Sequence, residues 1–369
     1  MTYENTKRQL NFELLRIVSM MLIITLHFIS HGEAVQLSGK YSAMNIIMLF
    51  IDLCAMVSVN CYVLLSSYFL KGTISLKKIW LLWMEVEFYS IAIYLFLCLL
   101  GKSAFSWGEL MIVLLPIFNK RYWFFTCYII FYVLTPLLNK IVTAIDRRAH
   151  LGLILGGLAI LSILPDIWKF LDIMSVGYGY TFLWFCYLYF VASYIRCYEV
   201  PKRKGGLFSF FVLAVIGSAC YLSRAYLEKV FYRTETISFS LGYKSFFVVA
   251  CSILLFLYFA NLKIENMKGE RILLSLASAT FGVYLIHDNY YMRAILWGVL
   301  HPYTYQNSWV LIPYWLFCVG LIFMVCSLIE LLRQYIFRII GIPKACEWIA
   351  GSLQKKWVLS CERIIKNQR

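Results

Sequence analysis

The sequence predicts an all-α membrane protein, a polytopic bundle of about ten transmembrane helices. Of the 369 residues, 62% are hydrophobic and only 14% are charged, whereas a soluble domain has about 25% charged residues. The mean hydropathy is +0.75. Because one span needs about 20 residues, a chain of this length with short connections supplies about ten spans and no further large domain. We therefore expect one membrane domain, residues 1–332.

The predicted spans are the apolar stretches long enough to cross a bilayer. The first follows Lys7 and Arg8 but contains Arg16 and His27, and no small-residue cleavage site comes after it, so we interpret it as a retained span rather than a signal peptide. Residues 110–118 are too few to cross and are expected to be re-entrant or interfacial. The predicted spans are residues 14–29, 44–70, 79–100, 123–142, 151–167, 180–195, 207–222, 245–261, 273–289 and 309–332.

The basic residues predict that both termini are cytoplasmic and that the protein is a multi-pass protein of the plasma membrane. With the N-terminus inside, the cytoplasmic segments hold more than twice as many Lys and Arg residues as the external ones, as the positive-inside rule requires. This asymmetry accounts for the net charge of +15, so the expected partner is the lipid bilayer and not nucleic acid. Residues 333–369 mix apolar and basic side chains and are predicted to form a basic amphipathic tail on the cytoplasmic surface.

The 12 cysteines predict neither a disulfide framework nor a metal site. Their spacing matches no metal-binding pattern, and most lie inside apolar stretches, where cysteine behaves as a small hydrophobic residue. We expect no metal and no tightly bound cofactor.

Four ionisable residues share one face of the first predicted span. At 100° per residue, Glu13, Arg16, His27 and His31 fall within a stripe of about 60°. A polar stripe facing lipid is costly, so this one is expected to line a cavity or a partner helix.

The spacing along this stripe suggests a donor site. Arg16 and His27 lie about 16 Å apart along the helix axis, a distance comparable to a phosphopantetheine arm. A cytoplasmic arginine can hold phosphates, and a neutral imidazole deeper in the bilayer can accept a proton from a hydroxyl. The alternative is that Arg16 is a surface anchor and His27 a hydrogen-bonded histidine of the bundle.

Four motifs follow in order along the chain. In residues 11–32, a basic residue, Arg16, is followed by ten residues and then His27. Residues 59–70 contain Ser-Ser-Tyr at positions 66–68, with Ser67 where a Phe-x-x-Ser-Gly-Tyr pattern would have glycine. Residues 121–139 contain Tyr-Trp-Phe and exit in Pro-Leu-Leu-Asn, and residues 281–289 contain Gly-x-Tyr-Leu-x-His. Together these segments resemble acyltransferase family 3, whose members O-acetylate bacterial polysaccharides, lipopolysaccharide and peptidoglycan.

The resemblance implies an O-acyltransferase that moves an acetyl group from acetyl-CoA, the co-substrate, to a hydroxyl of an envelope glycan or exopolysaccharide. It implies that His27 is the catalytic histidine and Arg16 its companion, with Glu13 orienting His27 or pairing with Arg16. The family often has an arginine-rich loop after its second helix. Lys71, Lys77 and Lys78 stand there in this sequence, so they are the candidate contacts to donor phosphates, without the bidentate geometry of arginine.

Further candidates for the acceptor side or the cavity wall carry alternatives. His31 can relay protons or bind the glycan, or it is a solvated interfacial histidine. His287 and Asp288 form a polar cluster opposite His27 or cap a helix end. Arg121, Tyr122 and Trp123 form a sugar-stacking platform or an ordinary interfacial belt. Ser67 is also a candidate for the acceptor side or the cavity wall.

Other functional classes also use intramembrane charges and basic loops. A transporter or flippase of a polysaccharide precursor is the main alternative, but its discontinuous helices and internal repeats are not found in this sequence. A second alternative, a lipid-linked sugar polymerase, is expected to carry large external loops, and the external loops predicted here are short. Some relatives carry an esterase-like domain after the last span. Here only residues 333–369 follow, so the membrane domain is expected to act alone or with partner proteins of polysaccharide assembly.

Overall fold

The computed structural model describes residues 8–35, 42–71, 73–117, 119, 121–167, 177–198, 206–232, 242–264 and 267–367, and these residues contain helices and no strand. The elements in chain order are α1 (Leu10–Ser30), α2 (Ala43–Phe69), α3 (Leu76–Leu99), α4 (Trp107–Val113), α5 (Trp123–Ala144), α6 (Arg147–Leu158), the π-helical η1 (Ala159–Ile163), α7 (Leu164–Ile167), α8 (Phe182–Cys197), α9 (Gly206–Tyr232), α10 (Phe246–Asn261), α11 (Glu270–His287), α12 (Tyr290–Leu300), the 3-10 helix η3 (Pro302–Tyr305), α13 (Leu311–Ile339) and α14 (Ile342–Asn367).

The helices form a multi-pass membrane protein. Within the described residues, seven are long and apolar enough to cross a bilayer: α1, α2, α3, α5, the continuous helix from α6 to α7, the first part of α9, and α13. α8 and α10 are apolar but shorter. The outward faces carry large apolar side chains such as Leu137, Phe208 and Leu328, which are 57%, 75% and 62% exposed. A surface of this kind is stable against lipid and not against water.

Each of the predicted spans overlaps a helix, but two elements differ from the prediction. α12 occupies residues expected to be a loop. Its N-terminus is capped by the Asn289 side chain, which accepts hydrogen bonds from the backbone N–H groups of Tyr291 and Met292 at 3.0 and 3.4 Å. α13 continues to Ile339, beyond the expected end at residue 332, because the charged side chain of Arg333 has partners inside the bundle.

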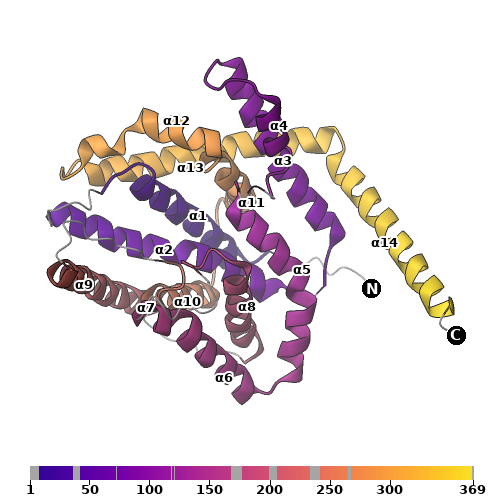
Figure 1. Ribbon diagram of the computed structural model, residues 1–369, viewed down its shortest axis with the longest axis horizontal. Coiled ribbons are helices and arrows are strands. Elements are labelled where there is room, and N and C mark those ends of the chain that lie inside the picture. The colour runs from indigo at the N-terminus through magenta and orange to yellow at the C-terminus, as the bar shows by residue number, and fades with distance from the viewer. Residues whose placement is uncertain are drawn as a thin grey trace.

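α1 and α2 occupy the middle of the bundle, with α12 and α13 on one side and α8, α9 and α10 on the other (Figure 1). Leu15, Ile24 and Phe28 of α1 are completely buried. The last turn of α2 is closed by Arg196 of α8, whose guanidinium donates to the backbone carbonyl of Leu70 at 2.8 Å and to two neighbouring carbonyls. A cation at a helix C-terminus satisfies carbonyls that have no partner within the helix.

A buried ionic cluster joins α3, α11 and α13. Arg333 donates to both carboxylate oxygens of Glu330, at 2.8 and 2.6 Å, and lies 3.6 Å from Glu85 of α3. The hydroxyl of Tyr89 donates to Glu330 at 2.7 Å. At Gly282 of α11 a Cβ would collide with the Glu330 carboxylate, so glycine is needed for this close approach. The cluster fixes how these helices pack.

The predicted tail is helical, and α14 projects away from the rest of the bundle (Figure 1). Lys77 of α3 forms an ion pair of 2.7 Å with Glu347, which ties the first turns of α14 to α3. Residues 368–369 and the side chains after residue 354 lie outside the described part of the chain. The place of this tail on the membrane surface therefore stays a prediction.

Candidate active site

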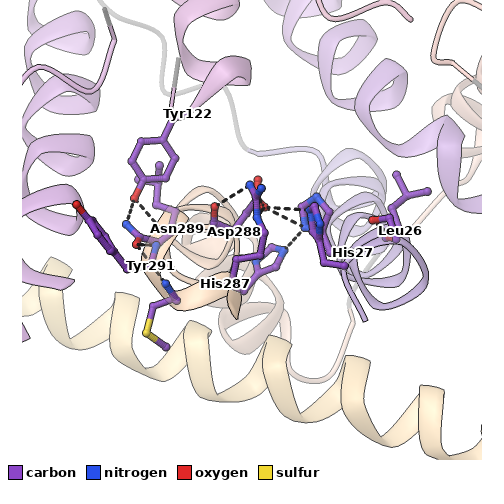
Figure 2. Close-up of polar contacts among 12 residues, drawn as sticks. Leu26, His27, Tyr122, His287, Asp288, Asn289 and Tyr291 are labelled. Atoms are coloured by element: carbon purple, nitrogen blue, oxygen red, sulfur yellow. Dashed lines mark hydrogen bonds and ion pairs between the residues drawn. The ribbon is translucent and has the colours of Figure 1, made fainter. Parts of the chain in front are cut away.

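Two histidines from distant parts of the chain meet in the centre of the bundle. His27 lies near the end of α1 and His287 is the last residue of α11, and Figure 2 shows their rings facing each other. The Nδ1 of His27 is 2.9 Å from the Nε2 of His287. The Nδ1 of His287 is in turn 2.6 Å from the backbone carbonyl oxygen of Val283.

These two contacts fix the proton positions on both neutral rings. A carbonyl oxygen can only accept, so the Nδ1 of His287 carries the proton and its Nε2 is an acceptor. The Nδ1 of His27 must then donate to that Nε2. Because a neutral imidazole has a single N–H, the Nε2 of His27 is left unprotonated and able to accept a proton. His27 is thus held in the tautomer of a general base.

Asp288 adds a negative charge beside the histidine pair. Its Oδ1 lies 3.8 Å from the Nδ1 of His27 and 3.8 Å from the Nε2 of His31. Arg293 of α12 approaches the same oxygen at 2.8 Å and donates to it through Nε at 3.1 Å. His27, His31 and Asp288 have ligand atoms within 4.8 Å of one another, a spacing that could hold a metal ion. The guanidinium on the Asp288 oxygen favours a hydrogen-bonded ion pair instead.

The segment that presents His287 and Asp288 is anchored to the start of α5. The hydroxyl of Tyr122 donates to the backbone carbonyl of Leu285 at 3.1 Å and accepts from the Asn289 amide at 2.6 Å. Figure 2 shows Tyr122 reaching down to Asn289 from α5. Tyr122 is only 1% exposed, so a buried and satisfied phenol holds the junction between α11 and α12.

A cavity of about 320 Å³ extends from His27 towards the first turns of α1, and we call it the Arg16 cavity. It is lined by Arg16, Met20 and Ile23 of α1 and by Lys78 of α3. Arg16 is 3.4 Å from Glu13 and its side chain remains 36% exposed. The Nζ of Lys78 lies 4.9 Å from the centre of the Tyr132 ring. Two cations therefore stand at one end of this cavity and a histidine at the other.

A second cavity, of about 570 Å³, extends from His27 towards the opposite end of α1, and we call it the His31 cavity. Its polar wall includes His31, Asp52 and Arg293. His27, Trp123 and Tyr243 line both cavities. These three side chains, which we call the partition, lie where the two cavities adjoin.

A family model described as an acyltransferase domain matches residues 9–331. The chain belongs to acyltransferase family 3. The resemblance drawn from the four motifs is thereby confirmed, and the protein is a membrane acyltransferase. Neither the curated proteins nor the solved structures provided a match.

The candidate site residues named from the sequence do not all lie in the same place in this acyltransferase: some line a cavity and others do not. The Arg16 cavity is lined by Arg16, the His31 cavity by His31 and Asp288, and both cavities by His27 and Trp123. Glu13 is buried beside Arg16, and His287 and Tyr122 lie behind the wall as supports. Of the three lysines, Lys78 lines the Arg16 cavity, whereas Lys77 pairs with Glu347 and Lys71 is exposed without lining it. Ser67 is fully buried, and its neighbour Ser66 lines the cavity instead.

Arg121 belongs to a separate clamp. It donates to the carboxylate of Glu109 in α4 at 2.8 Å and to the hydroxyl of Tyr291 at 2.7 Å. The hydrogen bond from Tyr291 has the largest effect on Glu109, and together with the hydrogen bond from Arg121 it lowers the pKa of this carboxyl group. This clamp joins α4 to α12 and does not line either cavity.

Some residues of the site were not predicted from the sequence. Tyr243 precedes α10 in a short turn, and nothing in its local sequence separates it from the many other tyrosines. Arg293 lies between two predicted spans, in a stretch expected to be a loop, although it is a single charge inside an otherwise apolar helix. That isolation is a signal that could have marked it. The role of the Val283 carbonyl belongs to the backbone and leaves no trace in residue types.

Proposed function

We propose that this acyltransferase moves an acetyl group from acetyl-CoA on the cytoplasmic side to a hydroxyl of an envelope glycan or exopolysaccharide on the other side of the plasma membrane. The proposal includes ten spans with both termini cytoplasmic. One observation supports it above the others: His27, held as a base, lies in a wall shared by two cavities that lead to opposite ends of α1.

The Arg16 cavity suits the donor. Arg16 and Lys78 can bind the phosphate groups of coenzyme A at the cytoplasmic mouth. The distance of about 16 Å along α1 from Arg16 to His27 places the thioester at the end of an extended pantetheine arm. The apolar wall between these points, including Met20 and Ile23, fits an uncharged chain.

The His31 cavity suits a sugar. Trp123, Tyr180 and Tyr243 give it an aromatic side on which a sugar ring can stack. Asp52 and Glu33 can accept hydrogen bonds from sugar hydroxyls. The acceptor hydroxyl would then point at the Nε2 of His27.

The transfer is a single displacement at the thioester carbonyl. The acceptor oxygen forms a bond to the carbonyl carbon while its proton passes to the Nε2 of His27. The carbon–sulfur bond then breaks, and the protonated His27 returns the proton to the leaving thiolate. The products are a glycan ester and free coenzyme A, and the histidine pair is restored. Asp288, 3.8 Å from His27, stabilises the transient positive charge.

The test is the O-acetyl content of envelope glycans, measured by proton NMR and mass spectrometry. Cells lacking the protein are complemented with the wild type, with His27→Ala, or with His301→Asn, a control at an exposed histidine whose left-handed backbone suits asparagine. We expect the wild type and His301→Asn to restore acetyl groups and His27→Ala to fail. Full acetylation with a well-expressed His27→Ala protein would overturn the proposal.

A further inference from the structure

The partition between the two cavities has the geometry of a size filter. The acyl group must enter the reaction with its carbonyl carbon next to His27. The other side chains that line both cavities at that point are Trp123 and Tyr243. Their rings lie nearly parallel, with centres 5.8 Å apart and an interplanar angle of 18°. An acyl chain that extends from His27 between the two cavities therefore has these two rings as part of its surroundings.

Tyr243 forms a fixed part of this filter. Its backbone N–H donates to the carbonyl of Tyr178 at 2.8 Å, and its own carbonyl accepts from the Asn60 side chain at 2.8 Å. Asn60 is held in turn by the indole N–H of Trp184, at 3.0 Å. Tyr243 and Asn60 are only 5% and 0% exposed, so this side of the partition is rigid.

Trp123 completes the filter from the other side. It is the first residue of α5, and its ring packs against Tyr180 with centres 4.5 Å apart. Tyr180 is 45% exposed and lines only the His31 cavity. Trp123 thus lines the Arg16 cavity on one side and the His31 cavity on the other, and with His27 it belongs to the partition.

We propose that Trp123, backed by Tyr243, is the specificity-determining residue for acyl length. The Trp123–Tyr243 pair admits an acetyl group beside His27 and excludes longer acyl chains. This inference rests on the proposed function, because it takes an acyl-CoA as the donor. The chemistry is unchanged: the acyl carbon passes from thiol sulfur to acceptor oxygen, and the proton passes through His27 to the thiolate.

The experiment compares acetyl-, propionyl- and butyryl-CoA as donors for the purified full-length protein with its glycan acceptor. In the wild type, we expect kcat/KM to fall about 10- to 100-fold from acetyl to butyryl, the range in which a pocket discriminates small apolar groups. Trp123→Ala should reduce that ratio by about tenfold or more. Trp123→Phe should reduce it less, and this milder change serves as the measurement if Trp123→Ala is not recovered folded.

Phe69→Ala is the matched control. Phe69 lines the same cavity at its cationic end, away from the partition, and is 47% exposed. Its removal should weaken binding of all three donors alike and leave the acyl preference unchanged.

Three outcomes decide the matter. An altered acyl preference in the Trp123 variants and not in Phe69→Ala supports the filter. A wild-type protein that uses butyryl-CoA as well as acetyl-CoA, or Trp123 variants with the wild-type ratio, overturns it while leaving the transferase proposal intact. The proposed function, and this inference with it, is overturned by two results together. The purified wild-type protein transfers from none of the three donors, and glycan acetylation in cells does not depend on the protein.

Discussion

Replacing His287 tests whether the base at His27 depends on its partner. The Nδ1–H of His27 donates to the Nε2 of His287 at 2.9 Å, and His287 is held by the Val283 carbonyl at 2.6 Å. In His287→Ala, the N–H of His27 loses its acceptor in a site where His287 was 1% exposed. The proton is then no longer confined to Nδ1, and the ring is free to present an N–H to the acceptor hydroxyl.

The expected loss follows from the cost of an unsatisfied buried donor. That cost is about 1–3 kcal/mol, so His287→Ala should lower kcat/KM by about 5- to 160-fold. Removing the base itself in His27→Ala should cost more, about 100- to 10,000-fold. The double variant should be no worse than His27→Ala, because the two residues act as one unit.

The assay is acetyl transfer from acetyl-CoA by purified protein, with His287→Gln as the matched variant. The glutamine carbonyl can accept from the Nδ1–H of His27, so His287→Gln should lose less activity than His287→Ala. Wild-type activity in His287→Ala would refute the tautomer argument. A His287→Gln variant as impaired as His287→Ala would show that the hydrogen bond is not the cause.

Three further predictions concern the donor cavity, the ionic cluster and the clamp of α4. Lys78→Ala should raise KM for acetyl-CoA about tenfold, whereas Lys77→Ala, which loses only the ion pair with Glu347, should not; equal effects in a donor titration would contradict this. Arg333→Met strands the buried Glu330 and should destabilise the protein by about 3–5 kcal/mol, seen as a lower thermal midpoint in detergent, with recovery when Glu330→Leu is added; an unchanged midpoint would contradict it. The pKa of Glu109 is lower in the folded protein than in the unfolded chain, so its stabilising effect is complete above the ordinary carboxyl pKa and is lost as pH falls through the lowered value. Thermal midpoints of wild type and Glu109→Gln should therefore converge on acidification, and a constant gap would count against the clamp.

The helices and the polar stripe of α1 could be predicted because they depend on local periodicity. Runs of apolar residues identify spans, and the 100° step of a helix determines which side chains share a face. The structure places Arg16, His27 and His31 along cavity walls, in the order that this stripe gave. Family membership was equally accessible, because it rests on motifs within single helices.

The contacts between distant segments could not be predicted. His27 and His287 are 260 positions apart, and their meeting depends on how α1 and α11 pack within the whole bundle. For the same reason Arg121 was grouped with Trp123, its near neighbour in sequence. In the structure, Arg121 forms the clamp with Glu109, whereas Trp123 lines both cavities. The number of spans is also harder to fix than the helices, because α8 and α10 are apolar but short.

The partition described above has a consequence for the cell that is separate from synthesis. Within the described residues, His27, Trp123 and Tyr243 line both cavities, which extend towards opposite ends of α1. In the proposed orientation the partition also has to hold back protons and small ions, which the transmembrane potential drives with about 2.3 kcal/mol per charge at 100 mV. In that orientation, the rings of Trp123 and Tyr243 would also have to limit the passage of ions. A substitution that widens the partition is therefore expected to let ions cross the membrane and to lower the transmembrane potential.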